Sequence, residues 1–312
     1  MLYSNTTAEA KRQNLREMLV PGAARQFPGT FTPLSAPLIQ EKGFDGLYIS
    51  GAVLANELGL PDVGLTTLTE VAQRAGQIAR MSDLPALVDA DTGFGEPMNV
   101  ARTIHELENA GLAGCHIEDQ VNPKRCGHLD GKSTVGTETA TMRIRAAADA
   151  RRDSEFLIMA RTDLRATASL EATIDRAQAL VDAGADAIFP EAMKDLAEFE
   201  AVCAALDVPV LANMTEFGKS ELFTRGQLAS AGVAIVIYPV TSLRAAMGAI
   251  ERTLDTITAD GTQQEAVPEM MTRARLYELV DYESYNAFDT GIFNFAVPGT
   301  ATGSAPSEGA RS

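Results

Sequence analysis

The chain has little that would suit it to a membrane, an oxidising compartment or a polyanionic partner. It contains no run of twenty apolar residues, so the sequence offers no candidate transmembrane helix. The stretch from Met1 to Leu15 is polar and charged and lacks the apolar core of a secretory signal. Its 26 lysines and arginines face 42 aspartates and glutamates, which gives a formal net charge of -16. This charge argues against nucleic acid and against an anionic membrane surface as partners.

Cysteine is also scarce. Only Cys115, Cys126 and Cys203 are present, their spacing is not that of a metal site, and three thiols cannot all pair. A reducing cytoplasm is therefore the expected setting. Apolar residues are plentiful at 46% of the chain, enough for a large core. A length of 312 residues fits one α/β barrel or two smaller domains.

Short β-type runs alternate with helical patterns through most of the chain. An amphipathic helix is expected over residues 8–20, followed by a stretch punctuated by proline and glycine over residues 21–28. The expected strands are Phe31–Ala36, Gly46–Ser50, Ala86–Ala90, Ala113–Glu118, Phe156–Arg161, Ala187–Pro190, Val208–Asn213 and Val233–Tyr238. Helical patterns between them include Val100–Ala110, Glu138–Ala150, Leu170–Ala183 and Leu196–Ala205. Eight apolar strands alternating with amphipathic helices predict a closed (β/α)8, or TIM, barrel with a parallel sheet.

The pattern changes after the last expected strand. Ala245–Ala259 reads as a helix with no strand after it, and Met270–Tyr282 as a further helix. Glycine, serine, alanine and proline dominate from about residue 296. We therefore expect one barrel domain over residues 1–295, which includes the N-terminal helix and extra C-terminal helices, and a flexible tail over residues 296–312.

Polar residues gather where the expected strands end. In chain order they are Ser50, Asp89 with Asp91, Glu118 with Asp119, Arg161 with Asp163, Glu191, Asn213 with Thr215, and Pro239 with Ser242 and Arg244. Active sites of (β/α)8 barrels form at the carboxyl ends of the strands. Capping of the following helix would explain one or two of these residues. It accounts poorly for Arg161, Glu191 and Arg244, so we interpret the set as one shared site.

Asp89 and Asp91 are candidate metal ligands. Residues two apart share one face of a regular strand, so both carboxylates could approach one ion near the strand end. Carboxylate oxygens without histidine or cysteine suit Mg²⁺, which keeps several waters. Asp62 and Glu118 could hold those waters. Taken alone, the pair is better explained as two solvated aspartates before a glycine turn.

The run from Lys124 to His128 concentrates cations around a thiol. Lys124, Arg125 and His128 favour the thiolate of Cys126 and should lower its pKa. A basic surface turn holding an ordinary cysteine is the plainer alternative. Beside paired carboxylates, however, the thiol suits general acid catalysis of carbon–carbon cleavage next to a hydroxyl. His128, Glu191 and Arg161 are candidates for tuning it, whereas His105 and His116 are assigned no catalytic role.

Arginines indicate the charge of the substrate. Arg161, Arg244 and Arg273 can each bind a carboxylate through two parallel hydrogen bonds. Cations in so acidic a protein predict a small polycarboxylate as the substrate.

Five segments resemble the 2-methylisocitrate lyases of the isocitrate lyase/phosphoenolpyruvate mutase superfamily. They are Val88–Gly95, His116–Gln120, Lys124–His128, Met159–Asp163 and Asn213–Phe217, and the resemblance runs from about residue 10 to residue 285. It implies a TIM barrel whose last helix is exchanged between subunits of a homotetramer, with a mobile catalytic loop around Cys126. It also implies Mg²⁺, for which Mn²⁺ can substitute. The implied reaction splits 2-methylisocitrate, a small tricarboxylate, into pyruvate and succinate in the methylcitrate cycle of propionate catabolism.

The resemblance also implies roles for individual residues. Cys126 would be the catalytic thiol, with Glu191, His128 and Arg161 beside it, and Asp89 and Asp91 would hold the metal. Contacts to substrate would come from Ser50, Gly51, Ala52, Cys126, Gly127, His128, Arg161, Glu191, Asn213, Met214, Thr215, Arg244 and Arg273. Two positions depart from the pattern of the family: Ala52 replaces a frequent glycine, and Ile237 stands where leucine is expected.

Isocitrate lyase is the nearest alternative, since it shares the metal, the loop and the chemistry. That family usually reads KKCGH, carries long insertions and narrows its site with a tryptophan. This chain has Arg125, is short and contains no tryptophan. Phe189, Ile237 and Pro239 stand at the matching places and would line a pocket for the extra methyl group. Phosphonate-cleaving mutases lack the CGH sequence, and a non-catalytic barrel serving only to bind would be expected to lose Cys126 or Asp91.

Overall fold

The computed structural model describes residues 4–125, 133–218 and 220–294. Contacts divide the chain into two compact units, Tyr3–Glu269 and a smaller one made of Met1–Leu2 and Met270–Ser312. The single domain expected over residues 1–295 stays a prediction. Cys126, Gly127 and His128, with the loop expected to be mobile around them, lie outside the described residues, as does the tail 296–312.

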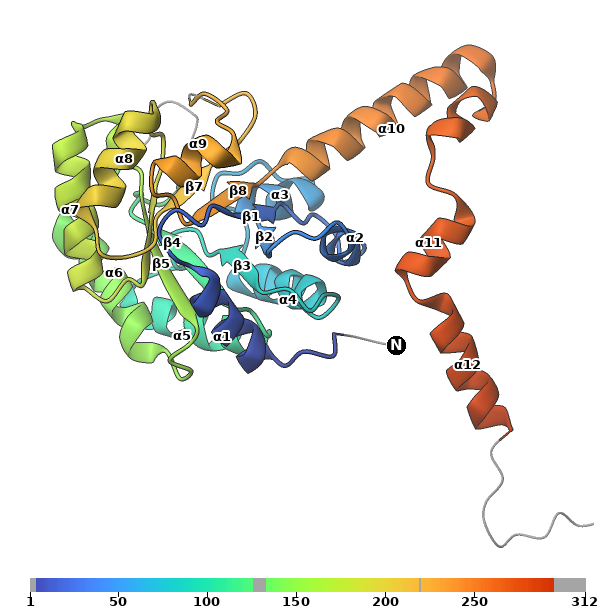
Figure 1. Cartoon of the computed structure of the whole chain (residues 1–312), viewed down its shortest axis with the longest axis horizontal. Helices are drawn as coiled ribbons and strands as arrows, with labels where there is room; N and C mark the ends of the chain where they lie inside the picture. The colour runs from blue at the N-terminus through green and yellow to red at the C-terminus, as the bar shows by residue number, and fades with distance from the viewer. Residues whose placement is uncertain (1–3, 126–132, 219, 295–312) are drawn as a thin grey trace, which may run out of the picture. The chain divides into compact units, whose positions relative to one another are not determined.

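The larger unit contains the predicted barrel, and its parallel strands form a closed ring in the described part of the chain (Figure 1). One sheet has the order β2-β3-β4-β5-β6 and the other β1-β8-β7. Single bridges join them, between Gly29 and Tyr48 and between Ile188 and Val210. The strands are β1 (Arg25–Pro28), β2 (Leu47–Ile49), β3 (Ala86–Asp89), β4 (Gly114–Glu118), β5 (Leu157–Thr162), β6 (Ala187–Pro190), β7 (Leu211–Asn213) and β8 (Ile235–Tyr238).

Helices follow the strands of this unit and cover the outside of the ring, except for α1, which precedes the first strand, and α10, which extends away from the ring (Figure 1). They are α1 (Ala8–Met18), α2 (Ser35–Glu41), α3 (Gly51–Glu57), α4 (Leu68–Ala79), α5 (Pro97–Asn109), α6 (Thr137–Ala150), α7 (Leu170–Asp182), α8 (Leu196–Ala205), α9 (Arg225–Ser230) and α10 (Thr241–Asp260), with short 3-10 turns at Leu164–Ala166 and Gln264–Glu269. Gly111, Gly184 and Gly232, which follow α5, α7 and α9, all have positive φ, the conformation in which many helices end.

Alternate residues of the strands face two separate cores. Tyr48 and Leu87 lie inside the barrel, whereas their neighbours Ile49 and Val88 pack outward against the helices. Leu15 of α1 belongs to the interior cluster. Nearby, the Arg12 guanidinium donates to the carbonyls of Leu112 (2.9 Å) and Glu108 (2.7 Å), just before β4. Helix α1 therefore closes the amino-terminal end of the barrel.

The first expected strand, Phe31–Ala36, is wrong. Residues 31–34 form no strand, and Ser35 begins α2, whose Pro37 lies in the first turn, where its missing N–H costs no helical hydrogen bond. The first strand is Arg25–Pro28, inside the stretch interpreted as a punctuated connection. Its pairing partner is β8, with Arg25 opposite Ile235, and Phe27 is fully buried in the barrel interior. Pro28 is tolerated because it is the last residue of the strand.

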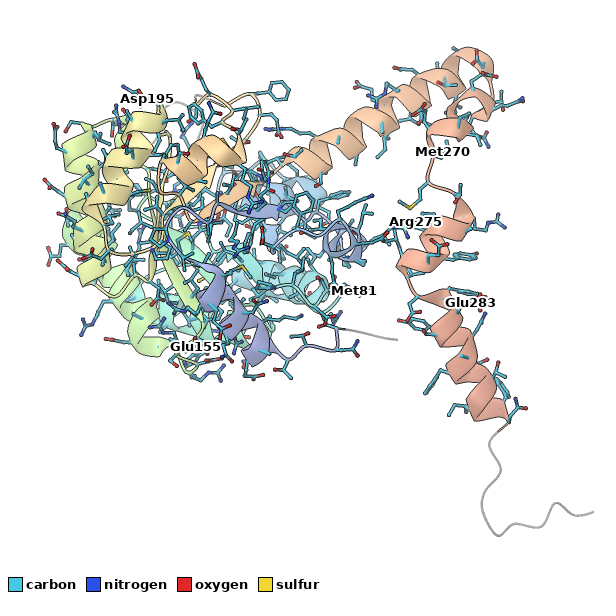
Figure 2. All side chains as sticks on the ribbon, in the orientation of Figure 1. Met81, Glu155, Asp195, Met270, Arg275 and Glu283 are labelled. Carbon is cyan, nitrogen blue, oxygen red and sulfur yellow. The ribbon has the colours of Figure 1, made fainter. Side chains whose placement is uncertain are left out.

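The helix expected over Met270–Tyr282 corresponds to α11 (Arg273–Leu279), and a further helix that was not predicted, α12 (Tyr282–Phe293), follows it. Asp281 between them adopts a left-handed conformation with φ 53°, which ends one helix before the next begins. In the larger unit, α10 has no buried residue, and its side chains stand out from the helix in Figure 2. Within the described ranges, none of the helices combines the length and apolar character that a membrane crossing requires.

Candidate active site

A small cavity lies at the carboxyl ends of the strands, where the sequence predicts the site. Eight of its lining residues were predicted: Ser50, Ala52, Asp62, Arg161, Glu191, Asn213, Thr215 and Pro239. Tyr48, Lys124 and Val240 complete the described lining. The barrel thus brings together side chains that are separated by up to about 190 residues in the chain.

Asp89 and Asp91 meet beside this cavity. Asp89 ends β3, and its carboxylate accepts hydrogen bonds from the N–H of Gly51 (3.2 Å) and of Asp91 (3.0 Å). Asp91 lies beyond the strand with φ 46°, so a left-handed turn, rather than the strand alternation that we expected, brings its carboxylate there. A Cβ on Gly51 would lie 2.9 Å from Asp89 Oδ2 and 3.1 Å from Asp91 Oδ1. Gly51 is therefore needed at this position for the pair to come so close.

The two carboxylates have opposite pKa shifts. Burial raises the pKa of Asp91 to about 6, and the neighbouring charge of Asp89 adds to the effect. Burial acts on Asp89 in the same direction, but His116, Lys124 and Arg161 outweigh it and lower its pKa to about 2. Two buried carboxylates that disfavour each other's ionisation are a favourable place for a cation.

Lys124 supplies a cation at this place. Its buried ammonium group lies 2.9 Å from Asp91 Oδ1 and also bonds to Asp62. Burial would lower the lysine pKa, but Asp91, Asp89, Glu118 and Asp62 raise it above the ordinary value, so the side chain stays charged. Asp62 therefore pairs with Lys124 rather than standing alone beside the aspartates.

Glu118 and Arg161 form the next layer of charge. Glu118 is 1% exposed, neither of its carboxylate oxygens accepts a hydrogen bond from a described residue, and Arg161 Nε lies 3.4 Å away. Burial raises the Glu118 pKa well above its usual range. Arg161 donates two parallel hydrogen bonds to Asp163, at 3.0 and 3.1 Å, and lies 3.8 Å from Glu191. Two parallel bonds fix the guanidinium plane at the mouth of the barrel.

The donor set fits Mg²⁺. Across the described residues, no three histidines, cysteines, aspartates or glutamates are grouped as a complete metal cage. Mg²⁺ does not require one, because it commonly takes one or two carboxylates and keeps waters as its other ligands. Asp89 and Asp91 provide the carboxylates, and the unbonded oxygens of buried Glu118 can accept hydrogen bonds from such waters.

The comparisons with known proteins agree with this chemistry. The chain matches the phosphoenolpyruvate phosphomutase family over residues 15–258. A Corynebacterium glutamicum protein named "Probable 2-methylisocitrate lyase 2" is 56% identical, across 95% of this chain and 96% of its own length. The chain belongs to the 2-methylisocitrate lyase family. This is a family of carbon–carbon lyases within the superfamily that the sequence motifs indicated.

Solved structures extend the likeness to the fold. A 2,3-dimethylmalate lyase, a member of the phosphoenolpyruvate mutase/isocitrate lyase superfamily, superposes with a TM-score of 0.85 at 34% identity, covering 94% of this chain and 99% of its own. A phosphonopyruvate hydrolase crystallised with oxalate and Mg²⁺ gives a TM-score of 0.83 at 29% identity, covering 91% and 99%. The closed barrel is thus shared with enzymes that act on small oxo acids or hydroxy acids.

The remaining predicted residues lie in different surroundings. Arg244 lies at the rim, where its guanidinium donates to Thr215 at 3.3 Å. Met214 is buried in the outer core and its sulfur accepts from the N–H of Phe223, so its side chain points away from the cavity. Arg273 begins α11 in the smaller unit, and its contact with substrate stays a prediction, as do the roles of the loop residues from Cys126 to His128.

The three residues expected to line a methyl pocket are not equivalent. Pro239 borders the cavity, whereas Phe189 and Ile237 are fully buried inside the barrel. The Phe189 ring lies 4.9 Å from the Arg161 guanidinium and 5.2 Å from the His116 ring. Phe189 therefore supports Arg161 from below, and it can affect a methyl group only at the floor of the cavity.

Three residues at the site were not predicted from the sequence: Tyr48, His116 and Lys124. Tyr48, two residues before Ser50 on the same strand face, shares a 2.7 Å hydrogen bond with His116 Nε2. His116 is fully buried, and burial lowers its pKa to about 4, so the ring is neutral at neutral pH. Strand alternation could have identified Tyr48, and Lys124 stands in a segment already singled out. His116 was assigned no catalytic role from the sequence, but its Nδ1 lies 3.7 Å from Asp89 Oδ1.

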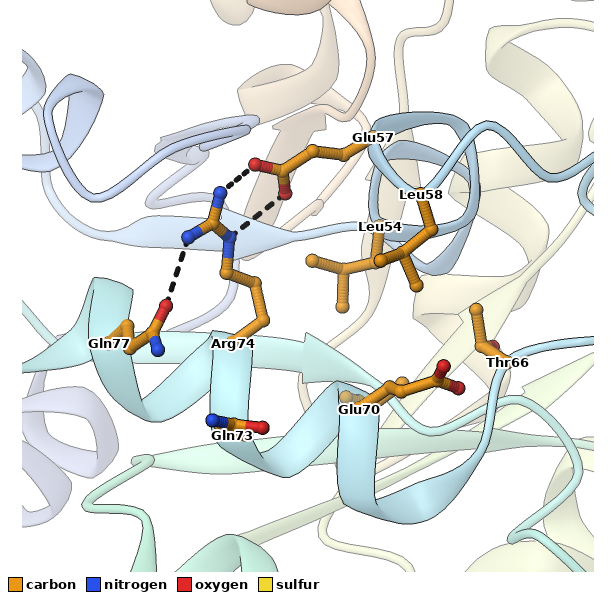
Figure 3. Close-up of a pocket in the computed structure, with 9 residues that line it drawn as sticks. Leu54, Glu57, Leu58, Thr66, Glu70, Gln73, Arg74 and Gln77 are labelled. Carbon is orange, nitrogen blue, oxygen red and sulfur yellow. Dashed lines mark hydrogen bonds and ion pairs between the residues drawn. The ribbon is translucent and has the colours of Figure 1, made fainter.

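A separate cavity of about 400 Å³ lies between α3 and α4 (Figure 3). Arg74 forms an ion pair with Glu57 there, with Nε donating at 2.9 Å, and also donates to Gln77 at 2.9 Å. None of the residues predicted for the site lines this cavity. Arg74 and Glu57 are already paired with each other, and Glu70 accepts hydrogen bonds from Thr67 at the start of α4. We therefore place the chemistry at the strand ends.

Proposed function

We propose that this chain is a Mg²⁺-dependent lyase that splits 2-methylisocitrate into pyruvate and succinate in the methylcitrate cycle of propionate catabolism. The observation that carries the proposal is the pair of buried aspartates next to a fixed arginine at the carboxyl end of the barrel. Relatives named 2-methylisocitrate lyase support the choice of substrate. The expected setting is the cytoplasm.

Asp89 and Asp91 would hold the metal, and Asp62 and Glu118 would accept hydrogen bonds from its waters. When bound, Mg²⁺ supplies a Lewis acid that stabilises the negative charge developing on the hydroxyl oxygen of the substrate. Mn²⁺ can substitute because it accepts the same oxygen ligands. Gly51, packed against both carboxylates, keeps room for their close approach.

The other residues bind the carboxylates of the substrate and move one proton. Arg161, Arg244 and Arg273 would bind carboxylates, with Ser50, Ala52, Glu191, Asn213 and Thr215 completing the polar contacts. The substrate hydroxyl gives up its proton to water as the carbon–carbon bond breaks; the electron pair of that bond passes to the succinate carbon, and the hydroxyl carbon becomes the carbonyl of pyruvate. Cys126 then gives its thiol proton to the succinate carbon as general acid.

Isocitrate is the competing substrate. Pro239, Phe189 and Ile237 are proposed to accommodate the extra methyl group, which is worth only about 1–3 kcal/mol of discrimination. We therefore expect strong preference for 2-methylisocitrate with measurable cleavage of isocitrate.

A coupled assay tests the proposed function. Pyruvate release from 2-methylisocitrate is compared with glyoxylate release from isocitrate, each with Mg²⁺, with Mn²⁺ and after chelation. We expect pyruvate release to dominate, to stop on chelation and to return with either ion, and Asp91→Ala to remain inactive at saturating Mg²⁺. Faster glyoxylate release would favour isocitrate lyase, and full turnover after exhaustive chelation would refute the metal site.

Assembly is also part of the proposal. The helices α11 and α12 expose apolar side chains, among them Leu276, Tyr277, Val280, Tyr285, Phe288 and Ile292. Apolar side chains in such numbers on short helices need a covering surface. We propose that the last helix packs on a neighbouring subunit and that four chains assemble.

A further inference from the structure

Arg244 at the rim of the cavity is held by one of its nitrogens. That single terminal nitrogen, Nη1, donates to Thr215 Oγ1 (3.3 Å), to the Glu216 carbonyl (2.8 Å) and to Glu216 Oε2 (2.8 Å). Within the described ranges, Nε and Nη2 have no hydrogen-bond partner. The edge formed by these two nitrogens is the one that matches a carboxylate in a two-bond geometry.

Glu216 is itself held in place from a second element. Thr241, the first residue of α10, donates its hydroxyl to Glu216 Oε1, while Oε2 receives Arg244. Burial would raise the Glu216 pKa, but the hydrogen bonds from Thr241 and Arg244 lower it below its usual value. The carboxylate therefore stays ionised and connects the loop after β7 to the start of α10 (Figure 1).

The neighbouring Phe217 restricts the guanidinium further. The central carbon of the guanidinium lies over this ring, 5.4 Å from its centre, although the ring is 94% exposed. Phe217 has φ 60°, a left-handed conformation that turns the chain directly after Glu216. One nitrogen of Arg244 is thus occupied, an aromatic ring lies beside the guanidinium, and Thr215, the other residue it contacts, lines the cavity.

We infer that Glu216 is a positioning residue, which fixes Arg244 through one nitrogen so that its Nε–Nη2 edge is presented to a carboxylate of the substrate. This rests on the proposed function, in which Arg244 binds that carboxylate. An exposed arginine loses rotamer freedom when it binds a ligand, and a side chain already fixed in place loses less. Glu216 contributes by this pre-organisation and not by touching the substrate.

Simple electrostatics predicts the opposite effect of removing Glu216. A negative charge 2.8 Å from Arg244 weakens the attraction of the site for an anion, so deleting it should tighten anion binding. Loss of positioning should loosen it. The sign of the change therefore decides between the two roles.

The experiment measures succinate affinity by calorimetry, together with KM and kcat for 2-methylisocitrate, in wild type and variants. Glu216→Ala should raise the Kd of succinate and the KM about tenfold, which corresponds to one hydrogen bond to a charged group, with kcat within about twofold.

Further variants test the same contact. Glu216→Gln keeps an acceptor, so its Kd and KM should lie between those of Glu216→Ala and the wild type. Thr241→Val should raise both constants too, and Thr241→Ser, which keeps the hydroxyl, should restore them. Glu221→Gln is the matched control: it removes a charge from an exposed residue of the same loop and should raise neither the Kd of succinate nor the KM.

Unchanged or tighter succinate binding by Glu216→Ala would overturn the inference. The inference would also be overturned if Thr241→Val had the wild-type Kd for succinate and Glu216→Ala had the same Kd as Glu221→Gln. A wild-type chain that binds succinate without cleaving 2-methylisocitrate would overturn the proposed function instead, and the succinate affinities of the variants would still decide the role of Glu216.

Discussion

The three thiols of the chain differ in how much thiolate each can form. Burial raises the pKa of Cys203 to about 11 and that of Cys115 well above its usual value. Cys126 lies among Lys124, Arg125 and His128 in the sequence, where positive charge lowers a thiol pKa. Cys126 should therefore be the reactive thiol at neutral pH.

We predict that Cys126→Ser folds and binds substrate but loses turnover. A serine hydroxyl is nearly isosteric but a far weaker acid, and general acid catalysis contributes a factor of about 10²–10⁴, so kcat should fall at least that much while KM changes little. Iodoacetamide at pH 7.5 should inactivate the wild type, with peptide mass spectrometry showing the label on Cys126 and succinate protecting it. The label on Cys203 should rise about tenfold per pH unit up to its pKa, because only thiolate reacts.

Two outcomes would contradict this role. One is a Cys126→Ser variant that keeps more than about a tenth of the wild-type kcat, since such a loss is below the usual range for a general acid. The other is inactivation that follows the label on Cys203 rather than the label on Cys126.

At the scale of the elements, the join between β1 and β2 is one of the two places where a single bridge closes the ring. It consists of a single bridge, Gly29 with Tyr48, and the N–H of Gly29 also donates to Tyr238 at 2.9 Å. A Cβ on Gly29 would lie 2.0 Å from the carbonyl oxygen of Pro239, which is backbone and cannot turn away. Closure of the ring and the cavity wall at Pro239 thus depend on the same glycine.

We predict that Gly29→Ala lowers the free energy of unfolding by about 1–3 kcal/mol, as overpacked positions do, and raises KM by displacing Pro239. Chemical denaturation and the coupled assay measure the two effects. Gly226→Ala is the matched control, because a Cβ there meets nothing within 4 Å and alanine favours the helix α9. Equal stability of the Gly29 variant and the wild type would show that the backbone yields at this join.

The barrel and most of its site could be predicted because parallel strands bring their carboxyl ends together whatever the loops do. That rule placed Arg161, Glu191 and Asn213 correctly around one cavity. It failed for β1, a four-residue strand ending in proline, whose partner β8 lies about 200 residues away and leaves no local pattern. The pairing of Lys124 with Asp62 could not be predicted from the sequence either, because a contact between two loops leaves no periodic pattern.

At the scale of the whole molecule, the exposed apolar side chains of the C-terminal helices are the basis for predicting an assembly. We predict that the full chain elutes at four times the mass of one subunit, because α11 and α12 need an apolar partner surface. Removal of residues 270–312, which lie outside the barrel unit, should leave a folded barrel that no longer forms tetramers. Light scattering and circular dichroism measure both. A full-length monomer at micromolar concentration would refute the prediction.

Helix α1 has a consequence for the way the chain is made. Its Leu15 belongs to the interior cluster, which also contains side chains from β1, β5 and β8, so this cluster is complete only when strands from the whole length of the ring are present. The ribosome delivers α1 long before β8, and domains generally fold as units. Helix α1 must therefore wait, with its apolar face unburied, until nearly the whole barrel has been synthesised. Chaperone demand during translation should accordingly fall only after β8 has emerged.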